Sequence, residues 1–164
     1  MDVGANLRLF LIDFAILVVM AITIGFIAPR CPDLWFSRDI GPLRLTRFDT
    51  ARLYRRLGIP WFSKWLPEGG SWFGGESKSS LFGIDAAALE AYLVEVRRGE
   101  WVHFLSAFTF IPLVFFNPWW MMLIWFLIVG VGNMVFFSVL RYNQMRISRS
   151  EEHTSELQSR VDIS

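Results

Sequence analysis

The sequence predicts an all-α, polytopic membrane protein with about three transmembrane helices and an amphipathic, interfacial loop in the cytoplasm. Three observations favour this fold class. Of the 164 residues, 54% are hydrophobic and 16% aromatic, which is typical of membrane proteins with aromatic interface anchors. The hydrophobic residues gather in stretches of about 20, the length that a helix needs to cross a bilayer. Polar side chains at the inner ends of these stretches indicate a working site, because burying them in lipid is costly.

The first apolar stretch, residues 9–28, predicts a retained transmembrane helix. A cleaved signal peptide is the alternative, but Phe26 stands where a cut after Ala28 needs a small residue. Asp13 lies inside this helix near its outer end, at the expected level of Asn117. We interpret Asp13 as a structural partner of that turn.

The loop that follows is predicted to lie at the level of the lipid headgroups. Residues 48–57 form a short predicted helix, capped by Asp49 or Thr50 and ended by Gly58. Arginines alternate with leucine, tyrosine, tryptophan and phenylalanine through this segment, as in interfacial helices. Nucleic acid could bind such a mixture, but the neighbouring spans favour the bilayer as the partner.

The second half of the chain predicts a helical hairpin. A helix that starts near residue 86 is expected to continue without a break into a second span at residues 101–116. Asn117-Pro118 then forms a tight turn, since proline disfavours helix in the residue before it. Residues 119–140 form the third span. Residues 1–148 are therefore predicted to be a single membrane domain.

Basic residues near the spans predict the orientation of a multi-pass protein in the cell membrane. Arg8 is the only arginine on one side, and the others favour a cytoplasmic location for loop 30–98 and the C-terminus. The N-terminus is then outside. Cys31 is the only cysteine, which excludes an intramolecular disulfide, and we assign it a structural role.

The last residues, 149–164, resemble the translation of a common DNA-sequencing adapter. We predict that they are an artefact and disordered; a genuine polar tail is the alternative. Without them His103 is the only histidine. One histidine and one cysteine argue against a metal site.

The residues that could carry chemistry begin with Glu100 and His103, which share a helix face because they are three positions apart. A carboxylate there can orient an imidazole that acts as a general base in acyl transfer. The alternative is an interfacial histidine with a satisfied hydrogen bond.

The depth of two polar residues in the hairpin supports a joint site. His103 lies 14 residues before Asn117, about 21 Å along a helix. Asn133 lies 15 residues after Pro118, about 22 Å. The two side chains should therefore face each other, and Asn133 or Asn143 could donate to a developing oxyanion.

Further polar residues near the inner ends of the hairpin are candidates for substrate binding. The arginines could hold the phosphates of CoA or could only anchor the helices at the headgroups. The candidates are Glu95, Arg97, Arg98, Arg141, Tyr142, Asn143 and Arg146.

The order of these motifs resembles the glycosyl-4,4'-diaponeurosporenoate acyltransferase family over nearly all of the chain up to Ser148. The pattern is Glu-x-Arg-Arg-Gly-Glu-x-x-His, Asn-Pro, an intramembrane Asn, and Arg-Tyr-Asn-x-x-Arg. Residues 65–73 also resemble a loop of the family. Gln144 stands where the family often has arginine, and Phe104 where tryptophan is frequent. Neither departure removes a candidate catalytic group.

The resemblance implies a bacterial membrane acyltransferase. The family's named member adds a fatty acyl group to a sugar hydroxyl of a glycosylated carotenoid, the last step towards staphyloxanthin. We therefore expect acyl transfer from acyl-CoA, as co-substrate, to a hydroxyl of a glycosylated carotenoid or a similar lipid-like acceptor. No tightly bound cofactor and no metal are expected. The alternative is a non-catalytic membrane protein that assists a pigment or lipid biosynthetic enzyme.

Overall fold

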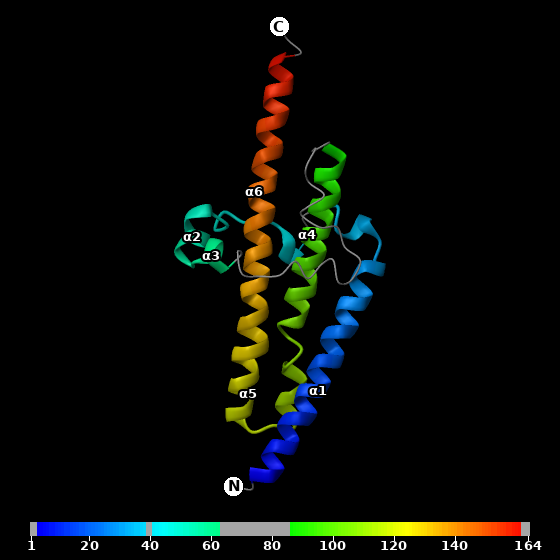
Figure 1. The fold of residues 1–164 in the computed structure, drawn as a ribbon, viewed down its shortest axis with the longest axis vertical. Helices are drawn as coiled ribbons and strands as arrows, with labels where there is room; N and C mark the ends of the chain where they lie inside the picture. The colour runs from blue at the N-terminus through cyan, green and yellow to red at the C-terminus, as the bar shows by residue number, and fades with distance from the viewer. Residues whose placement is uncertain (1–2, 39–40, 63–85, 162–164) are drawn as a thin grey trace.

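The computed structural model describes residues 3–38, 41–62 and 86–161, and all regular structure in these ranges is helical. Three long helices lie side by side: α1 (Val3–Ile27), α4 (Ala86–Ser106) and α6 (Gly132–Val161) (Figure 1). The all-helical prediction is confirmed. Residues 65–73 fall outside the described ranges.

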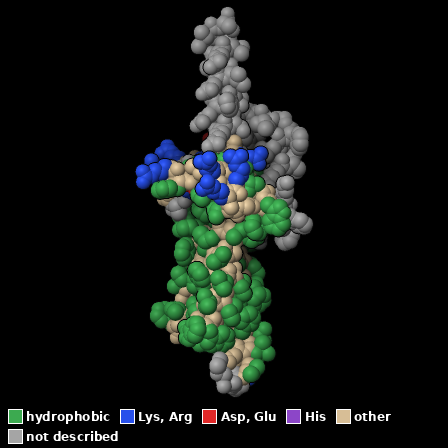
Figure 2. Space-filling model, turned by 90° about the vertical axis from the view of Figure 1, so that its left-hand side faces the viewer, with side chains coloured by type: hydrophobic (Ala, Val, Ile, Leu, Met, Phe, Trp, Pro, Cys, Tyr) green, Lys and Arg blue, Asp and Glu red, His purple; other side chains and the backbone are tan. Residues whose placement is uncertain are grey.

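Within the described ranges, two helical stretches are long and apolar enough to cross a membrane, namely Val3–Arg30 and Trp119–Arg146. Their outward side chains are large and apolar; Val19 of α1, for example, is 62% exposed and Leu127 54%. Figure 2 shows hydrophobic side chains covering the body of the bundle, with arginine side chains gathered in a band at one end. This distribution matches a bilayer environment, and it confirms the first and last predicted spans as helices of sufficient length.

The predicted unbroken helix from residue 86 to residue 116 is wrong. The helix α4 ends at Ser106, and a turn leads into the 3-10 helix η6 (Ile111–Phe115). Pro112 explains the break, because it has no N–H to continue the helix and its ring would clash with the carbonyl of Phe108. Thr109 compensates in part, since its Oγ1 donates to the Ser106 carbonyl over 2.8 Å. Residues 101–116 therefore do not form a helix of spanning length.

The turn at Asn117-Pro118 is confirmed, with α5 (Trp119–Trp125) starting directly after it. The return limb is continuous but not uniform, since a π-helical segment, η7 (Phe126–Val131), joins α5 to α6. Gly130 in this segment allows close packing, because a Cβ there would lie 3.2 Å from Cε1 of Phe110. The π-helical segment thus faces the turn that follows α4.

The described part of the loop between α1 and α4 begins with three 3-10 helices, η1 (Ala28–Arg30), η2 (Asp33–Trp35) and η3 (Gly41–Leu43). Two short α-helices follow, α2 (Ala51–Arg56) and α3 (Ile59–Phe62). Thr50 caps α2, since its Oγ1 accepts from the Leu53 N–H over 3.2 Å. Figure 1 shows α2 and α3 to one side of α6. They are held there by a cluster of buried side chains that joins α2 and α3 to α6: Tyr54, Ile59, Val139 and Met145.

At the C-terminal end, α6 runs to Val161 and so includes most of the residues that we predicted to be disordered. The helix thus includes residues 149–161, and their disorder stays a prediction. No glycine or proline occurs after Gly132, and Glu, Gln, Leu and Arg are good helix formers. The adapter origin of these residues stays a prediction.

Candidate active site

The hairpin brings His103 of α4 and Asn133 of α6 together, as their equal depth predicted. His103 Nδ1 lies 3.0 Å from Asn133 Oδ1. The ring of His103 also stacks on that of Phe136, with the centroids 4.9 Å apart and the planes at 10°. Both His103 and Asn133 are only partly buried. The imidazole is therefore held from two sides but is not sealed inside the protein.

The hydrogen bonds of Asn133 determine which nitrogen of His103 carries the proton. Asn133 Nδ2 donates to the carbonyl of Val129 over 2.8 Å, so Oδ1 is the atom that faces the ring. A carbonyl oxygen can only accept, which requires a proton on Nδ1 and leaves Nε2 of the neutral ring as the basic nitrogen. Asn133, and not the predicted Glu100, therefore makes the hydrogen bond that orients the imidazole.

Glu100 has a different partner from the predicted one. Its side chain is fully buried, and Oε2 accepts from Nη1 of Arg141 over 3.3 Å. The hydrogen bond of His103 goes to Asn133, so Glu100 does not orient the imidazole. A buried carboxylate is stable only when a cation or several donors compensate its charge, and Arg141 meets this requirement better than a neutral ring.

Arg141 is the centre of a buried polar network. Besides Glu100, it contacts Asp49 through Nε and Nη2, each 3.3 Å from a carboxylate oxygen, and its Nη2 donates to the Arg44 carbonyl. Tyr54 of α2 donates to the same carboxylate over 2.5 Å. The network therefore connects both limbs of the hairpin to the loop and to α2.

The charge of Asp49 is strongly stabilised by this network. Burial alone raises the pKa of Asp49, but hydrogen bonds from Tyr54, Arg141 and Thr46 together outweigh burial and lower that pKa to about 2. Burial and the hydrogen bond to Asp49 raise the pKa of Tyr54 above its ordinary value. Asp49 is thus an anion and Tyr54 a neutral donor at physiological pH.

Sequence reasoning assigned Asp49 only as a possible helix cap and did not assign Tyr54 to the site. The contact between Asp49 and Arg141 joins residues that are 92 positions apart, and no local spacing reveals it. One signal was available, because an arginine at the end of an apolar helix needs an acidic partner when it is buried.

Arg97 and Arg98 bind the segment that follows α1. Arg97 Nη1 donates to the carbonyls of Phe36 and Ser37, each over 3.4 Å. Arg98 forms ion pairs with Asp33 and with Glu95 one turn away. Both arginines are more than nine-tenths buried, with Arg97 9% exposed and Arg98 7% exposed. Their guanidinium groups are engaged with protein acceptors rather than presented to a ligand.

The remaining predicted binding residues on α6 follow Arg141 within five positions. Tyr142 is partly buried beside Tyr54, with the ring centroids 5.9 Å apart. Arg146 is exposed, and its guanidinium carbon lies 5.8 Å from the centroid of Tyr142. Asn143 is partly buried, whereas Gln144, the departure from the family pattern, is fully buried. Arg146 is therefore the predicted phosphate ligand that remains most accessible.

At the opposite end of the bundle, Asp13 is a structural residue, as predicted. It is 2% exposed and accepts hydrogen bonds from Asn117 Nδ2 over 3.2 Å and from Trp125 Nε1 over 3.0 Å. The ring of Phe10 stacks on Trp125. This polar layer attaches α1 to both sides of the hairpin turn.

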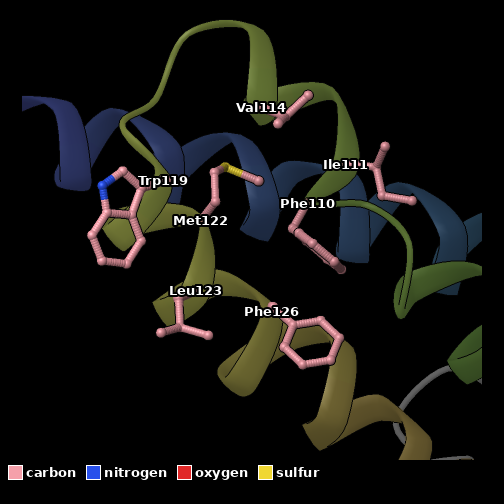
Figure 3. Close-up of a pocket in the computed structure, with 7 residues that line it drawn as sticks. All are labelled: Phe110, Ile111, Val114, Trp119, Met122, Leu123 and Phe126. Carbon is pink, nitrogen blue, oxygen red and sulfur yellow. The ribbon is translucent and has the colours of Figure 1, made fainter.

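An apolar groove of about 510 Å³ lies between η6 and α5 (Figure 3). Its lining is entirely apolar: Phe110, Ile111, Val114, Trp119, Met122, Leu123 and Phe126. Phe110 and Phe126 are in contact at one end, with ring centroids 5.9 Å apart. Phe110 also packs near Gly130, one turn from Asn133. The nearest lining residues, Phe110 and Phe126, are each seven positions from His103 and Asn133, on the side of the hairpin turn.

Among the residues that the structure describes, no group of three or more His, Cys, Asp or Glu side chains could hold a metal ion. Cys31 is partly exposed, and its Sγ donates to the Ile27 carbonyl.

A model of the glycosyl-4,4'-diaponeurosporenoate acyltransferase family matches residues 32–153. The matched range contains every side chain of the network around Arg141 and the pair of His103 and Asn133. Neither the curated proteins nor the solved structures include a match to the chain.

Proposed function

Because the chain belongs to the glycosyl-4,4'-diaponeurosporenoate acyltransferase family, we propose that it transfers a fatty acyl group from acyl-CoA to a sugar hydroxyl of a glycosylated carotenoid or similar membrane lipid. The family consists of acyltransferases of carotenoid biosynthesis, so the chain is an acyltransferase. The observation that supports the finer proposal is the pair of His103 and Asn133, whose hydrogen bond defines the tautomer of the imidazole and leaves Nε2 as the basic nitrogen.

In the proposed reaction His103 Nε2 accepts the proton of the acceptor hydroxyl as its oxygen attacks the thioester carbonyl. The tetrahedral intermediate collapses with loss of the CoA thiolate, which takes the proton back from His103. The products are the ester and free CoA. Asn133 keeps Nδ1 protonated through both steps, as the asparagine or carboxylate does in related base-and-orienter pairs. Its own amide is bonded at both ends, which favours this positioning role over oxyanion stabilisation.

The apolar groove is the proposed binding site for the end of the donor's acyl chain. From Asn133 to Trp119 the return limb covers 14 residues, about 21 Å. The acyl chains of one leaflet occupy about 15 Å, half of the hydrocarbon core. A fatty chain whose thioester lies at His103 would therefore end inside the groove. The flexible saturated chain suits this path better than a rigid polyene, because it must pass the rings of Phe110 and Phe126.

Narrowing the far end of the groove should change the chain-length preference. We expect Val114→Trp to lower transfer of long acyl chains relative to short ones by roughly tenfold, since a displaced chain also misplaces the thioester. The measurement is product formation from a series of acyl-CoA donors by the protein in detergent. Phe115→Trp is the matched control, because Phe115 is 83% exposed and outside the groove. Equal losses for all chain lengths would contradict the placement of the chain.

The same assay tests the proposed function itself. Purified protein, labelled acyl-CoA and a glycosylated carotenoid should give a labelled ester, and free CoA should appear in equal amount. Transfer to other glycolipids but not to the carotenoid glycoside would show that the acceptor is not a carotenoid. Absence of transfer from every acyl-CoA would remove CoA esters as donors.

We further propose that the N-terminus lies outside the cell and that the network around Arg141 lies at the cytoplasmic surface. The exposed arginines at that end support this orientation, while Arg8 stands at the other end. In a Cys31→Ser background, a cysteine at Ser148 should be protected from an impermeant thiol reagent in intact cells. A cysteine at Asn6 should react. The reverse pattern would invert the topology and move the donor to the outer side.

A further inference from the structure

The loop around α2 and α3 presents arginine and large apolar side chains together on one exposed surface. Trp61 is 60% exposed, Phe48 67% and Leu57 56%. We call this surface the platform. It consists of the exposed residues Arg47, Phe48, Arg52, Arg55, Arg56, Leu57, Trp61 and Phe62.

The platform lies at the border of the apolar part of the protein. The inner sides of α2 and α3 pack on Val139 and Met145, near the end of the apolar stretch Trp119–Arg146. Figure 2 shows the band of arginine side chains at the end of the hydrophobic body. At this level, aromatic side chains insert between lipids while arginines reach the phosphate groups.

The charge of the platform is not neutralised by its own segment. Residues 41–62 contain five arginines and a single acid, Asp49. Asp49 faces inward and is bonded to Arg141 and Tyr54. The four arginines of the platform are therefore exposed, and the one carboxylate of residues 41–62 is bonded on the inner side.

We propose that the platform binds anionic phospholipid headgroups and that this contact stabilises the network around Arg141. Each arginine near an anionic surface contributes about a fivefold preference for anionic over neutral lipid. The contact reaches the hairpin through α2, because Tyr54 on its inner face donates to Asp49 and Asp49 in turn binds Arg141. Lipid that holds α2 in place thereby holds the guanidinium that compensates Glu100.

The lipid contact is tested in nanodiscs made from equal parts of phosphatidylcholine and phosphatidylglycerol. Native mass spectrometry of the released protein counts the retained lipids of each kind. The wild type should retain phosphatidylglycerol preferentially, and Arg52→Gln/Arg55→Gln/Arg56→Gln should reduce this preference roughly tenfold or more. Arg30→Gln/Arg38→Gln is the matched control, since these exposed arginines lie outside the platform.

The link to Arg141 is tested by thermal unfolding in the same nanodiscs. Phosphatidylglycerol should raise the unfolding midpoint of the wild type but not that of the triple variant. Tyr54→Phe keeps the platform but loses the hydrogen bond to Asp49, so it should retain the lipid preference without the gain in midpoint.

Several results would overturn the proposal, and none depends on acyl transfer. Equal retention of phosphatidylglycerol by the wild type and the triple variant would remove the platform as a lipid site. Displacement of the lipid by soluble CoA would assign its arginines to the phosphates of the donor instead. An unchanged wild-type midpoint in phosphatidylglycerol would remove the link to Arg141.

Discussion

His103→Ala should lower the rate of acyl transfer by about 10²–10⁴-fold, the usual loss when a general base is removed. The fold should persist, because His103 is only partly buried and makes one side-chain hydrogen bond. The measurement is the single-turnover rate with saturating acyl-CoA, beside a thermal unfolding curve of the same sample.

Two further variants distinguish the loss of the general base from the loss of the hydrogen bond that orients it. His103→Gln can still donate to Asn133 but cannot accept the proton, so it should be as inactive as His103→Ala. Asn133→Ala keeps the general base but removes the hydrogen bond that orients it, so the rate of acyl transfer should fall less than in His103→Ala. Undiminished transfer by folded His103→Ala would leave the histidine as an interfacial residue only.

Glu100→Gln should destabilise the protein by about 3–5 kcal/mol, the typical cost of removing one partner from a buried ion pair. Glu100 is fully buried against Arg141, so no solvent replaces the lost charge. Arg141→Met should cost at least as much, since it leaves both Glu100 and Asp49 without the guanidinium. The free energy of unfolding in mixed micelles measures both changes.

Glu95→Gln is the matched control for Glu100→Gln on the same helix. Glu95 is paired with Arg98, but its side chain is 23% exposed, so the change should cost about 1 kcal/mol or less. Similar losses for Glu95→Gln and Glu100→Gln would show that burial of the pair with Arg141 is not what determines stability.

Features that depend on local sequence or on the geometry of a hairpin could be predicted. The turn at Asn117-Pro118 and the cap at Thr50 follow from residue preferences within a few positions. The contact between His103 and Asn133 followed from equal distances to the turn. The 3-10 and π-helical segments lie between these two residues and the turn, yet His103 and Asn133 still lie at the same depth.

Other features could not be predicted, or were missed, for identifiable reasons. The break after Ser106 was predictable from Pro112, whose effect on a preceding helix is local. The partner of Glu100 was not predictable, because two acceptable partners existed and only the packing of α4 on α6 selects Arg141. Asp49 comes from a loop whose position depends on α2 and α3 packing on α6.

The polar layer around Asp13 has a consequence for how the protein enters the membrane during synthesis. Trp125, which donates to the Asp13 carboxyl group, follows it by 112 residues. At about 5–20 residues per second, the ribosome needs roughly 6–20 s to supply that donor. Throughout this interval α1 carries a carboxyl group that lipid cannot solvate. The first helix should therefore remain beside the translocon until the hairpin emerges, and a nascent chain truncated before Trp125 should crosslink to the translocon for longer than one that includes it.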